Sequence, residues 1–240
     1  MTKASIGRVR KSQQYYGNVC TLNGCNLPRK SGHKLCLLHK GRAIYRGDAE
    51  QSLISKRDTN FARKTVRLLI ADNQLNPAWH DLMTAVQSNW DISQKAVTIE
   101  LMQSADGKAM NRYRRNGLRI CSAIFTEVGL EESFINYCSW QYLLEFNPRL
   151  FATDISFRHL VVKSLRSQAK DFCSYQVNKI TGKPTTYSSP LYMSERDFVW
   201  AIMHGIFGAT GLKLYAQLER RAERLRQNKL DINKAIRNIT

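Results

Sequence analysis

The sequence predicts a mainly α-helical protein, in which a small N-terminal module precedes a helical domain. From about residue 49 onward, apolar residues recur at spacings of three and four with charged residues between them, which is the periodicity of amphipathic helices. The alternation of apolar and polar residues that is typical of strands is nearly absent, and only residues 97–100 and 157–162 resemble it. A chain of 240 residues, 43% of them hydrophobic, is long enough to bury a core.

Three segments of different composition divide the chain. Residues 1–19 carry Lys and Arg among Ser, Gly and Gln without periodicity, so we expect a flexible basic arm there. Residues 20–48 are rich in glycine and too short to own an apolar core, so this module needs another source of stability. Residues 49–240 are predicted to form the helical domain, which ends in a basic helix.

The helices of this domain can be placed from their periodicity and their boundary residues. The first is predicted from about residue 49 to residue 70. The second begins at Pro77, because Asn76 suits the N-cap and proline is favoured at the first helical position. The polar segment over residues 178–193 is predicted to be a loop or a hairpin. Further helices are predicted over residues 95–104, 109–127, 131–146, 155–177, 194–208 and 212–237.

Three of the six cysteines lie within seventeen residues of one another, in the pattern Cys20-x4-Cys25-x10-Cys36-x2-His39. Thiolates and an imidazole at this spacing suit a tetrahedral Zn²⁺ site, and four protein ligands leave no position for a catalytic water, so the site is predicted to be structural. His33 is an alternative fourth ligand. The three other cysteines are predicted to be buried thiols: Cys121, Cys138 and Cys173.

Residues 20–48 resemble the small Cys3His zinc fingers of bacteriophage and mobile-element DNA-binding proteins, which often precede HNH endonuclease domains. The resemblance rests on the Gly24-Cys25 pair, on Cys36-x2-His39 and on a basic stretch that ends in Gly47-Asp48. It implies a finger that helps to grip DNA, in the cytoplasm of a bacterial host cell. By similarity, the candidate phosphate contacts are Arg29, Lys30, Lys34, Lys40, Arg42 and Arg46.

The charge of the chain is strongly positive and unevenly distributed. The net charge is +18, and residues 71–156 hold fewer basic than acidic side chains, so the excess lies towards the two ends. Such an imbalance favours a polyanionic partner. The first helix after the finger extends its positive charge through Lys56, Arg57, Arg63, Lys64 and Arg67. Further candidate nucleic-acid contacts are Arg112, Arg114 and Arg115, and in the last predicted helix Arg220, Arg221 and Arg224.

Motifs for catalysis are missing. The sequence lacks a Walker A motif, a G-x-S-x-G elbow, a G-x-G-x-x-G loop and an H-E-x-x-H pair. An HNH nuclease needs adjacent histidines, whereas His80, His159 and His204 are isolated. His159 and His204 are predicted to be structural. An aromatic cluster at Tyr137, Trp140, Tyr142 and Phe146 could stack bases, but its helical spacing favours a place in the core.

These observations predict a non-catalytic, zinc-containing nucleic-acid-binding protein, with DNA favoured over RNA, acting in phage or mobile-element transcription, replication or recombination. Two alternatives stay open: an RNA-binding or ribonucleoprotein factor, and a protein-interaction subunit that docks on a polymerase or replisome. No run of eighteen uncharged apolar residues and no apolar leader occurs, so we expect a cytoplasmic protein without a membrane partner.

Overall fold

The computed structural model describes residues 19–29, 32–106, 109–172, 174–177, 184–187 and 189–210, together with residues 220, 223 and 227. The fold of this part of the chain is mainly α, as predicted. The elements are α2 (Leu37–Arg46), α3 (Lys56–Asn73), α4 (Pro77–Ala105), α5 (Arg112–Ala123), a π-helical turn (Ile124–Val128), α6 (Leu130–Phe146), α7 (Asp154–Arg166), short 3-10 turns (Pro148–Leu150, Lys170–Phe172), β1 (Ser174–Val177), β2 (Pro184–Tyr187) and a helix at residues 193–210.

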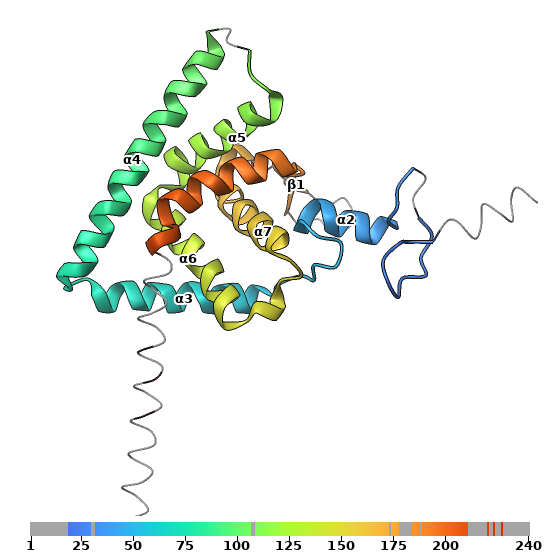
Figure 1. The fold of residues 1–240 in the computed structure, drawn as a ribbon, viewed down its shortest axis with the longest axis horizontal. Coiled ribbons are helices and arrows are strands. Elements are labelled where there is room, and N and C mark those ends of the chain that lie inside the picture. Colours follow the sequence, from blue (N-terminus) through green and yellow to red (C-terminus); the bar gives the residue numbers. More distant parts are fainter. Residues whose placement is uncertain are drawn as a thin grey trace, which may run out of the picture.

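The helices α3 and α4 lie along two edges of the helical body, and the other helices of the body pack between them (Figure 1). α3 and α4 meet at a corner and make two sides of a triangle, while α5 leads the chain back towards α6, α7 and the helix at residues 193–210. Among the labelled helices α2 to α7, the most extensive pairing is between α3 and α6, followed by α4 with α5 and α6 with α7. α2 leaves this body on the far side from α4 and carries the N-terminal module outward.

Aromatic side chains fill the centre of the helical body. Trp90 of α4 meets Phe125 edge to face, with ring centroids 4.6 Å apart. Phe134 of α6 meets Phe207 at 5.8 Å, also edge to face. Such pairs add about 0.5–1.5 kcal/mol each beyond the burial of their area. The core therefore joins helices that lie far apart in the sequence.

The predicted start of the second helix is confirmed. Asn76 caps α4, because its side-chain oxygen accepts a hydrogen bond from the backbone N–H of Ala78 at 3.1 Å, and Pro77 follows at the first helical position. The first helix begins later than predicted, at Lys56 instead of residue 49, because Ser55 caps it. The residues before this cap hold the buried Gln51, whose amide bonds the backbone of Leu150 and Ala152.

Two predicted boundaries are wrong. The separate helix at 95–104 is part of α4, which runs for 29 residues because no Gly or Pro interrupts it after its first position. The helix predicted over 155–177 ends at Arg166, and β1 pairs antiparallel with β2 at residues 174–177 and 184–187 instead. β2 lies within the segment 178–193 that is predicted to be a loop or a hairpin, whereas β1 precedes that segment. Residues 1–18 of the predicted arm at 1–19, and most of the predicted helix at 212–237, lie outside the described residues.

In the described part of the chain, no helix combines the length and the apolar character needed to cross a membrane.

Candidate metal centre and basic surfaces

The loop before α2 is shaped by local backbone contacts. The N–H of Cys20 donates to the carbonyl of Leu27 at 2.9 Å, and the N–H of Cys25 donates to the carbonyl of Leu22 at 3.1 Å. Gly24 has φ +76°, a left-handed conformation that glycine adopts without strain. These contacts fold the loop back on itself, which brings Cys20 and Cys25 close together.

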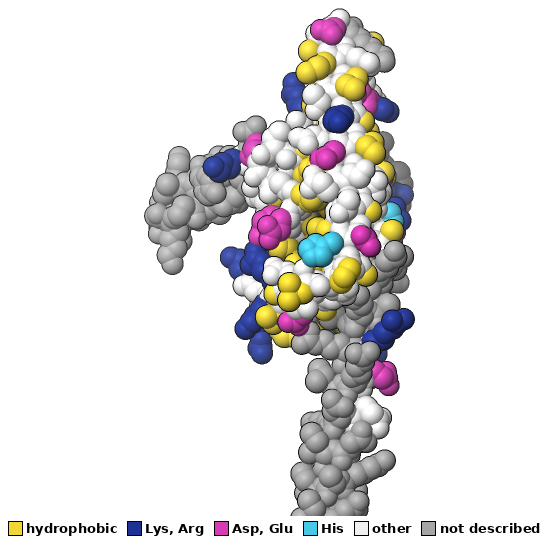
Figure 2. All heavy atoms as spheres, turned by 90° about the vertical axis from the view of Figure 1, so that its left-hand side faces the viewer, with side chains coloured by type: hydrophobic (Ala, Val, Ile, Leu, Met, Phe, Trp, Pro, Cys, Tyr) yellow, Lys and Arg dark blue, Asp and Glu magenta, His cyan; other side chains and the backbone are white. Residues whose placement is uncertain are grey.

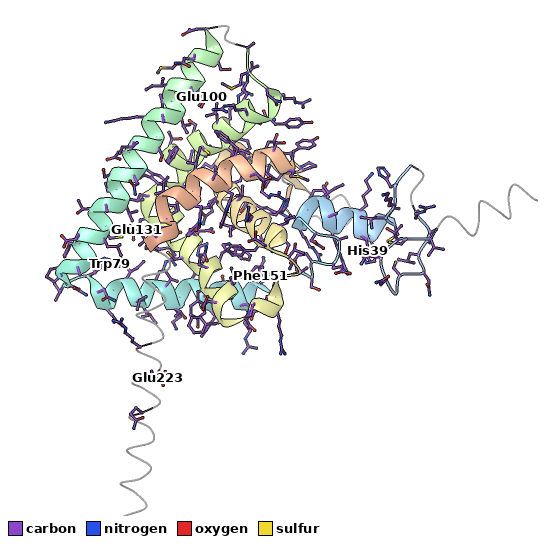
Figure 3. All side chains as sticks on the ribbon, viewed as in Figure 1. His39, Trp79, Glu100, Glu131, Phe151 and Glu223 are labelled. Atoms are coloured by element: carbon purple, nitrogen blue, oxygen red, sulfur yellow. The ribbon has the colours of Figure 1, made fainter. Side chains whose placement is uncertain are left out.

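The other two residues of the cluster come from the start of α2. Cys36 is the N-cap of this helix and His39 is in its first turn, so both are held by one rigid turn. Figure 3 places His39 at the outer end of α2, beside the loop. The spacing Cys36-x2-His39 therefore brings the two side chains together in the way that the sequence predicted.

The four ligand atoms form a compact group, all within 4.8 Å of one another, and could hold a metal ion. His39 Nδ1 lies 3.4 Å from Cys20 Sγ and 3.3 Å from Cys36 Sγ, and Cys25 Sγ lies 4.0 Å from Cys36 Sγ. Tetrahedral bonds of about 2.3 Å to sulfur and 2.0–2.1 Å to nitrogen place two sulfurs roughly 3.8 Å apart, and sulfur and nitrogen roughly 3.5 Å apart. The residues therefore fit a tetrahedral ion.

The electrostatics of the thiols also suit a cation. Burial raises the pKa of Cys20, but hydrogen bonds from the backbone of Cys36 and Leu22 outweigh it and lower the pKa to about 6. The pKa of Cys25 is raised: a backbone hydrogen bond at Leu27 lowers it, but burial and the neighbouring thiols Cys20 and Cys36 outweigh that bond. A bound divalent cation offsets this mutual repulsion of thiolates.

His33, the alternative fourth ligand, lies outside the group. Its side chain is exposed, and its Nε2 contacts Lys40 Nζ at 2.6 Å. His39 completes the cluster instead. Among the described residues, the other histidines belong to no group of metal ligands. His80 is exposed, His159 is buried, and His204 contacts the hydroxyl of Tyr137 through Nδ1 at 2.6 Å. Cys121 and Cys138 are buried as predicted, and Cys173 lies outside the described residues.

The basic residues of the module differ in their surroundings. Lys34 is exposed, whereas Arg29, Lys40 and Arg42 are half-buried. Arg46 already uses one of its hydrogen-bond donors within the protein, because its guanidinium donates to the carbonyl of Gln51 at 3.0 Å. Lys30 lies outside the described residues. The module therefore presents several cations around the metal cluster, and one of its predicted contacts ties α2 to the segment that follows.

Two of the three arginines at the start of α5 contact other side chains of the protein. Arg114 pairs with Glu100 of α4, and its guanidinium lies 5.5 Å from the ring centre of Phe198. Arg115 donates to Ser104 Oγ at 3.1 Å. Arg112 is exposed at the first position of α5. In the last predicted helix, Arg220 is helical and exposed, and Arg221 and Arg224 lie outside the described residues.

A further group of cations lies on α3. Helical spacing gathers its five cations towards one side of the helix, and we call Lys56, Arg57, Arg63, Lys64 and Arg67 the α3 basic face. Only Glu132 pairs with this set among the ion pairs of the described residues, contacting Arg63 and Arg67. Figure 2 looks onto the side of α4, where Lys and Arg are sparse over the middle and gather at the lower left, at the height of α3.

Sequence reasoning missed a polar pocket between α3, α6 and α7. Its lining includes Asn136, Trp140 and Ser164, which come from two of these helices. Trp140 is half-buried there, whereas Tyr137 is in the core, so the predicted aromatic cluster is divided between the two environments. No sequence signal marks such a pocket, because its residues are brought together only by helix packing.

Comparisons of this chain with family models, with curated proteins and with solved structures give no match.

Proposed function

We propose that this protein is a zinc-containing nucleic-acid-binding protein that acts without catalysis and favours DNA. The observation that carries the proposal is the α3 basic face, in which five cations on one side of a helix are balanced by one paired carboxylate. Phosphate groups are the partners that such a surface attracts most strongly, because binding releases counterions from the nucleic acid.

Zinc is the metal that suits the cluster best. Three thiolates and an imidazole are ligands that Zn²⁺ prefers, and the tetrahedral spacing of Cys20, Cys25, Cys36 and His39 leaves no open coordination position. The ion has a structural role, because the module around it is too small for an apolar core. It fixes the start of α2 and thereby the cations that surround the cluster.

DNA is favoured over RNA because of the resemblance of residues 20–48 to the fingers of phage and mobile-element DNA-binding proteins. In this proposal, the exposed cations of the module and of α3 hold the phosphate backbone, which gives affinity with little sequence preference. The biological setting is phage or mobile-element transcription, replication or recombination.

The test is a fluorescence-anisotropy titration of the metal-replete protein with duplex DNA, single-stranded DNA and RNA at low and moderate salt. We expect binding that weakens steeply with salt, since each neutralised phosphate contributes a slope of about −0.9 for duplex DNA. Arg57→Ala with Lys64→Ala should weaken binding to all three nucleic acids. Lys95→Ala, which removes an exposed cation from α4, is the matched control and should leave binding unchanged.

A second pair of variants tests the metal module. Cys36→Ser removes one ligand and should weaken binding, whereas His33→Asn changes a nearby histidine outside the cluster and should not. Absence of salt-dependent binding to any of the three nucleic acids would contradict the proposal. A preference for RNA would support the ribonucleoprotein alternative, and a protein partner that is retained after nuclease treatment would support the interaction-subunit alternative.

A further inference from the structure

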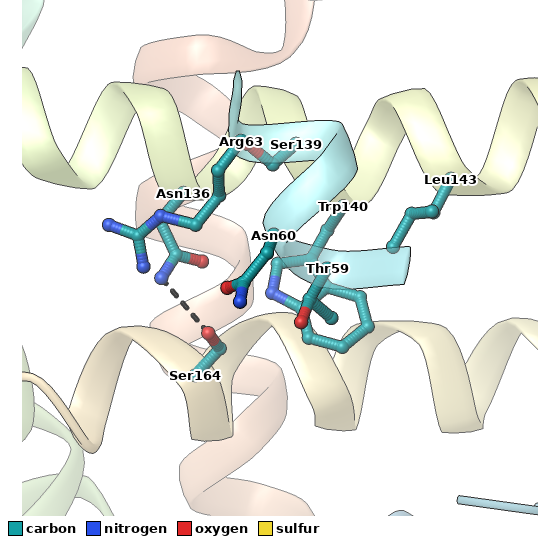
Figure 4. Close-up of a pocket in the computed structure, with 8 residues that line it drawn as sticks. All are labelled: Thr59, Asn60, Arg63, Asn136, Ser139, Trp140, Leu143 and Ser164. Carbon is teal, nitrogen blue, oxygen red and sulfur yellow. Dashed lines mark hydrogen bonds between the residues drawn. The ribbon is translucent and has the colours of Figure 1, made fainter. Parts of the chain in front are cut away.

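The pocket between α3, α6 and α7 has a volume of about 180 Å³. A cavity of about 150 Å³ is large enough for a benzene ring, so this pocket has room for one six-membered aromatic ring. Figure 4 shows the side chains that line it, which are mostly polar. Among them are Thr59, Asn60 and Arg63 of α3, Asn136 and Trp140 of α6, and Ser164 of α7.

One polar group in the pocket lacks a partner although it is buried. Asn136 is 2% exposed, and its side-chain amide nitrogen donates to Ser164 Oγ at 2.9 Å. Its side-chain oxygen has no hydrogen-bond partner, and in Figure 4 this oxygen points towards Asn60 and away from Ser164. Leaving a buried polar atom unpaired is unfavourable, and a ligand that donates a hydrogen bond to this oxygen removes that penalty.

The pocket also offers a ring on which a planar ligand can stack. Trp140 is half-buried in the wall, where its indole meets Phe151 edge to face with centroids 6.3 Å apart. The lining also contains Thr59 and Ser139, whose hydroxyls donate to backbone carbonyls of their own helices. A flat aromatic face beside amide and hydroxyl groups suits a nucleobase, which has a π face and an edge of donors and acceptors.

The place of the pocket connects it with the α3 basic face. Thr59, Asn60 and Arg63 line the pocket, and in the helical repeat Lys56, Asn60, Arg63, Lys64 and Arg67 follow one another on the same side of α3. Asn60 is exposed, so it stands at the rim. A strand held on the α3 basic face by its phosphates therefore passes the rim of the pocket.

We propose that this pocket takes one unpaired base of a bound nucleic-acid strand, with Asn136 bonding the base edge, Trp140 stacking on its face and the α3 basic face holding the adjoining phosphates. This inference rests on the proposed function and specifies its ligand as a single strand, or as a duplex with an unpaired base. A fully paired duplex cannot reach the pocket, because its bases are stacked inside the helix.

The test compares two labelled strands of about twelve nucleotides, a length within the usual site size of single-strand binding modules. One is ordinary single-stranded DNA, and the other keeps every phosphate but carries abasic spacers in place of all bases. We expect the ordinary strand to bind about ten-fold tighter, which corresponds to one stacked base. A duplex with one bulged base should likewise bind tighter than the same duplex fully paired.

Variants at the rim assign this preference to the pocket. Asn60→Leu places a larger apolar side chain at the rim, at an exposed position of α3. It should bring the ratio of the affinities for the ordinary and the abasic strand towards one, while binding to the abasic strand persists. Asn89→Leu makes the same change at an exposed position of α4 and should leave the ratio unchanged. Equal affinity of the native protein for both strands, or a ratio that survives Asn60→Leu, would overturn the inference.

Two further measurements distinguish a failure of the proposed function from a failure of the base pocket alone. Salt-dependent binding to the abasic strand reports on the proposed function alone, so its loss refutes that function and the inference that rests on it, whereas its retention with equal affinities refutes only the base pocket. Free nucleoside monophosphates serve as competitors in the same titration. If they bind as tightly as the strand does, the ligand is a free nucleotide, and the assignment to a strand is refuted.

Discussion

His159 is a titratable residue that the fold holds without charge. It is 2% exposed in α7, and its Nε2 has no hydrogen-bond partner. Burial, followed by the nearby charges of Lys163, Arg196 and Arg166, lowers its pKa from 6.5 to about 4, and a backbone hydrogen bond at Tyr45 opposes this shift. The prediction that this histidine is structural agrees with its position, since it packs beside Gly47 at the end of α2.

The stability of the protein should therefore fall at mildly acidic pH. Between pH 6.5 and pH 4 the unfolded chain binds a proton at His159 that the native state does not, so the free energy of unfolding decreases as the pH falls. The expected loss between pH 7 and pH 5 is about 2 kcal/mol from this group. Urea unfolding at both pH values should show a smaller loss for His159→Gln than for the native protein.

The control for this measurement is His80→Gln, which removes an exposed histidine of α4 and retains the metal cluster. It should keep the full pH dependence. Equal losses in His159→Gln and His80→Gln would show that the buried imidazole does not control the acid response.

At the scale of elements, the junction of α2 and α7 shows how the module is attached. α2 ends at Gly47, which has φ +82° and lies so close to α7 that an added Cβ would be 2.5 Å from His159 Cβ. Lys163 Nζ donates to the carbonyl of Tyr45 at 2.8 Å, and Thr153 Oγ1 donates to Asp48 at 3.2 Å. The end of α2 is therefore fixed by backbone geometry and by direct contact with α7.

Two glycine substitutions in this region should have opposite effects. Gly47→Ala should destabilise the protein by at least about 1–2 kcal/mol, because the left-handed conformation alone costs this much and the contact with His159 adds to it. Gly41→Ala lies inside α2 with no heavy atom within 4 Å of the added Cβ, so it should stabilise by about 0.5–1 kcal/mol. Urea unfolding of the two variants measures the difference, and shifts of the same sign would contradict the proposed junction.

On the scale of the whole molecule, the module and the helical body rest on different sources of stability. Among the described residues between 19 and 48, only Cys20 and Cys36 are buried. The body has a continuous apolar core that extends from Val66 in α3 to Phe207 in the helix at residues 193–210. The body should therefore stay folded when the module does not.

Removal of the metal should unfold part of the module and leave the helical body folded. Structural zinc contributes about 10–16 kcal/mol in small zinc-binding modules, so we expect a chelator to unfold the loop and the first turn of α2. Hydrogen exchange measured by mass spectrometry should become fast over residues 19–40 and stay slow in α6 and α7. Equal protection of the module with and without chelator would contradict a structural metal, and loss of protection in α6 would contradict an independent body.

Local signals in the sequence determined much of this architecture. The period of apolar residues predicted the helices, and Asn76-Pro77 predicted the start of α4, because capping depends on neighbouring residues alone. The pattern from Cys20 to His39 predicted the cluster, since a tight loop and one helical turn fix the ligand positions with little help from the rest of the chain. Fold class and candidate metal ligands were therefore readable from the sequence.

Only the tertiary structure decided how distant segments meet. In the tertiary structure α7 ends at Arg166, and β1 pairs with β2. Arg114 pairs with Glu100, whereas among the cations of the α3 basic face only Arg63 and Arg67 pair with a carboxylate, that of Glu132. The tertiary structure also assembled the pocket around Asn136, whose lining spans more than 100 positions of the chain. Such contacts depend on the packing of whole helices, and the periodicity of a single helix carries no information about its partner.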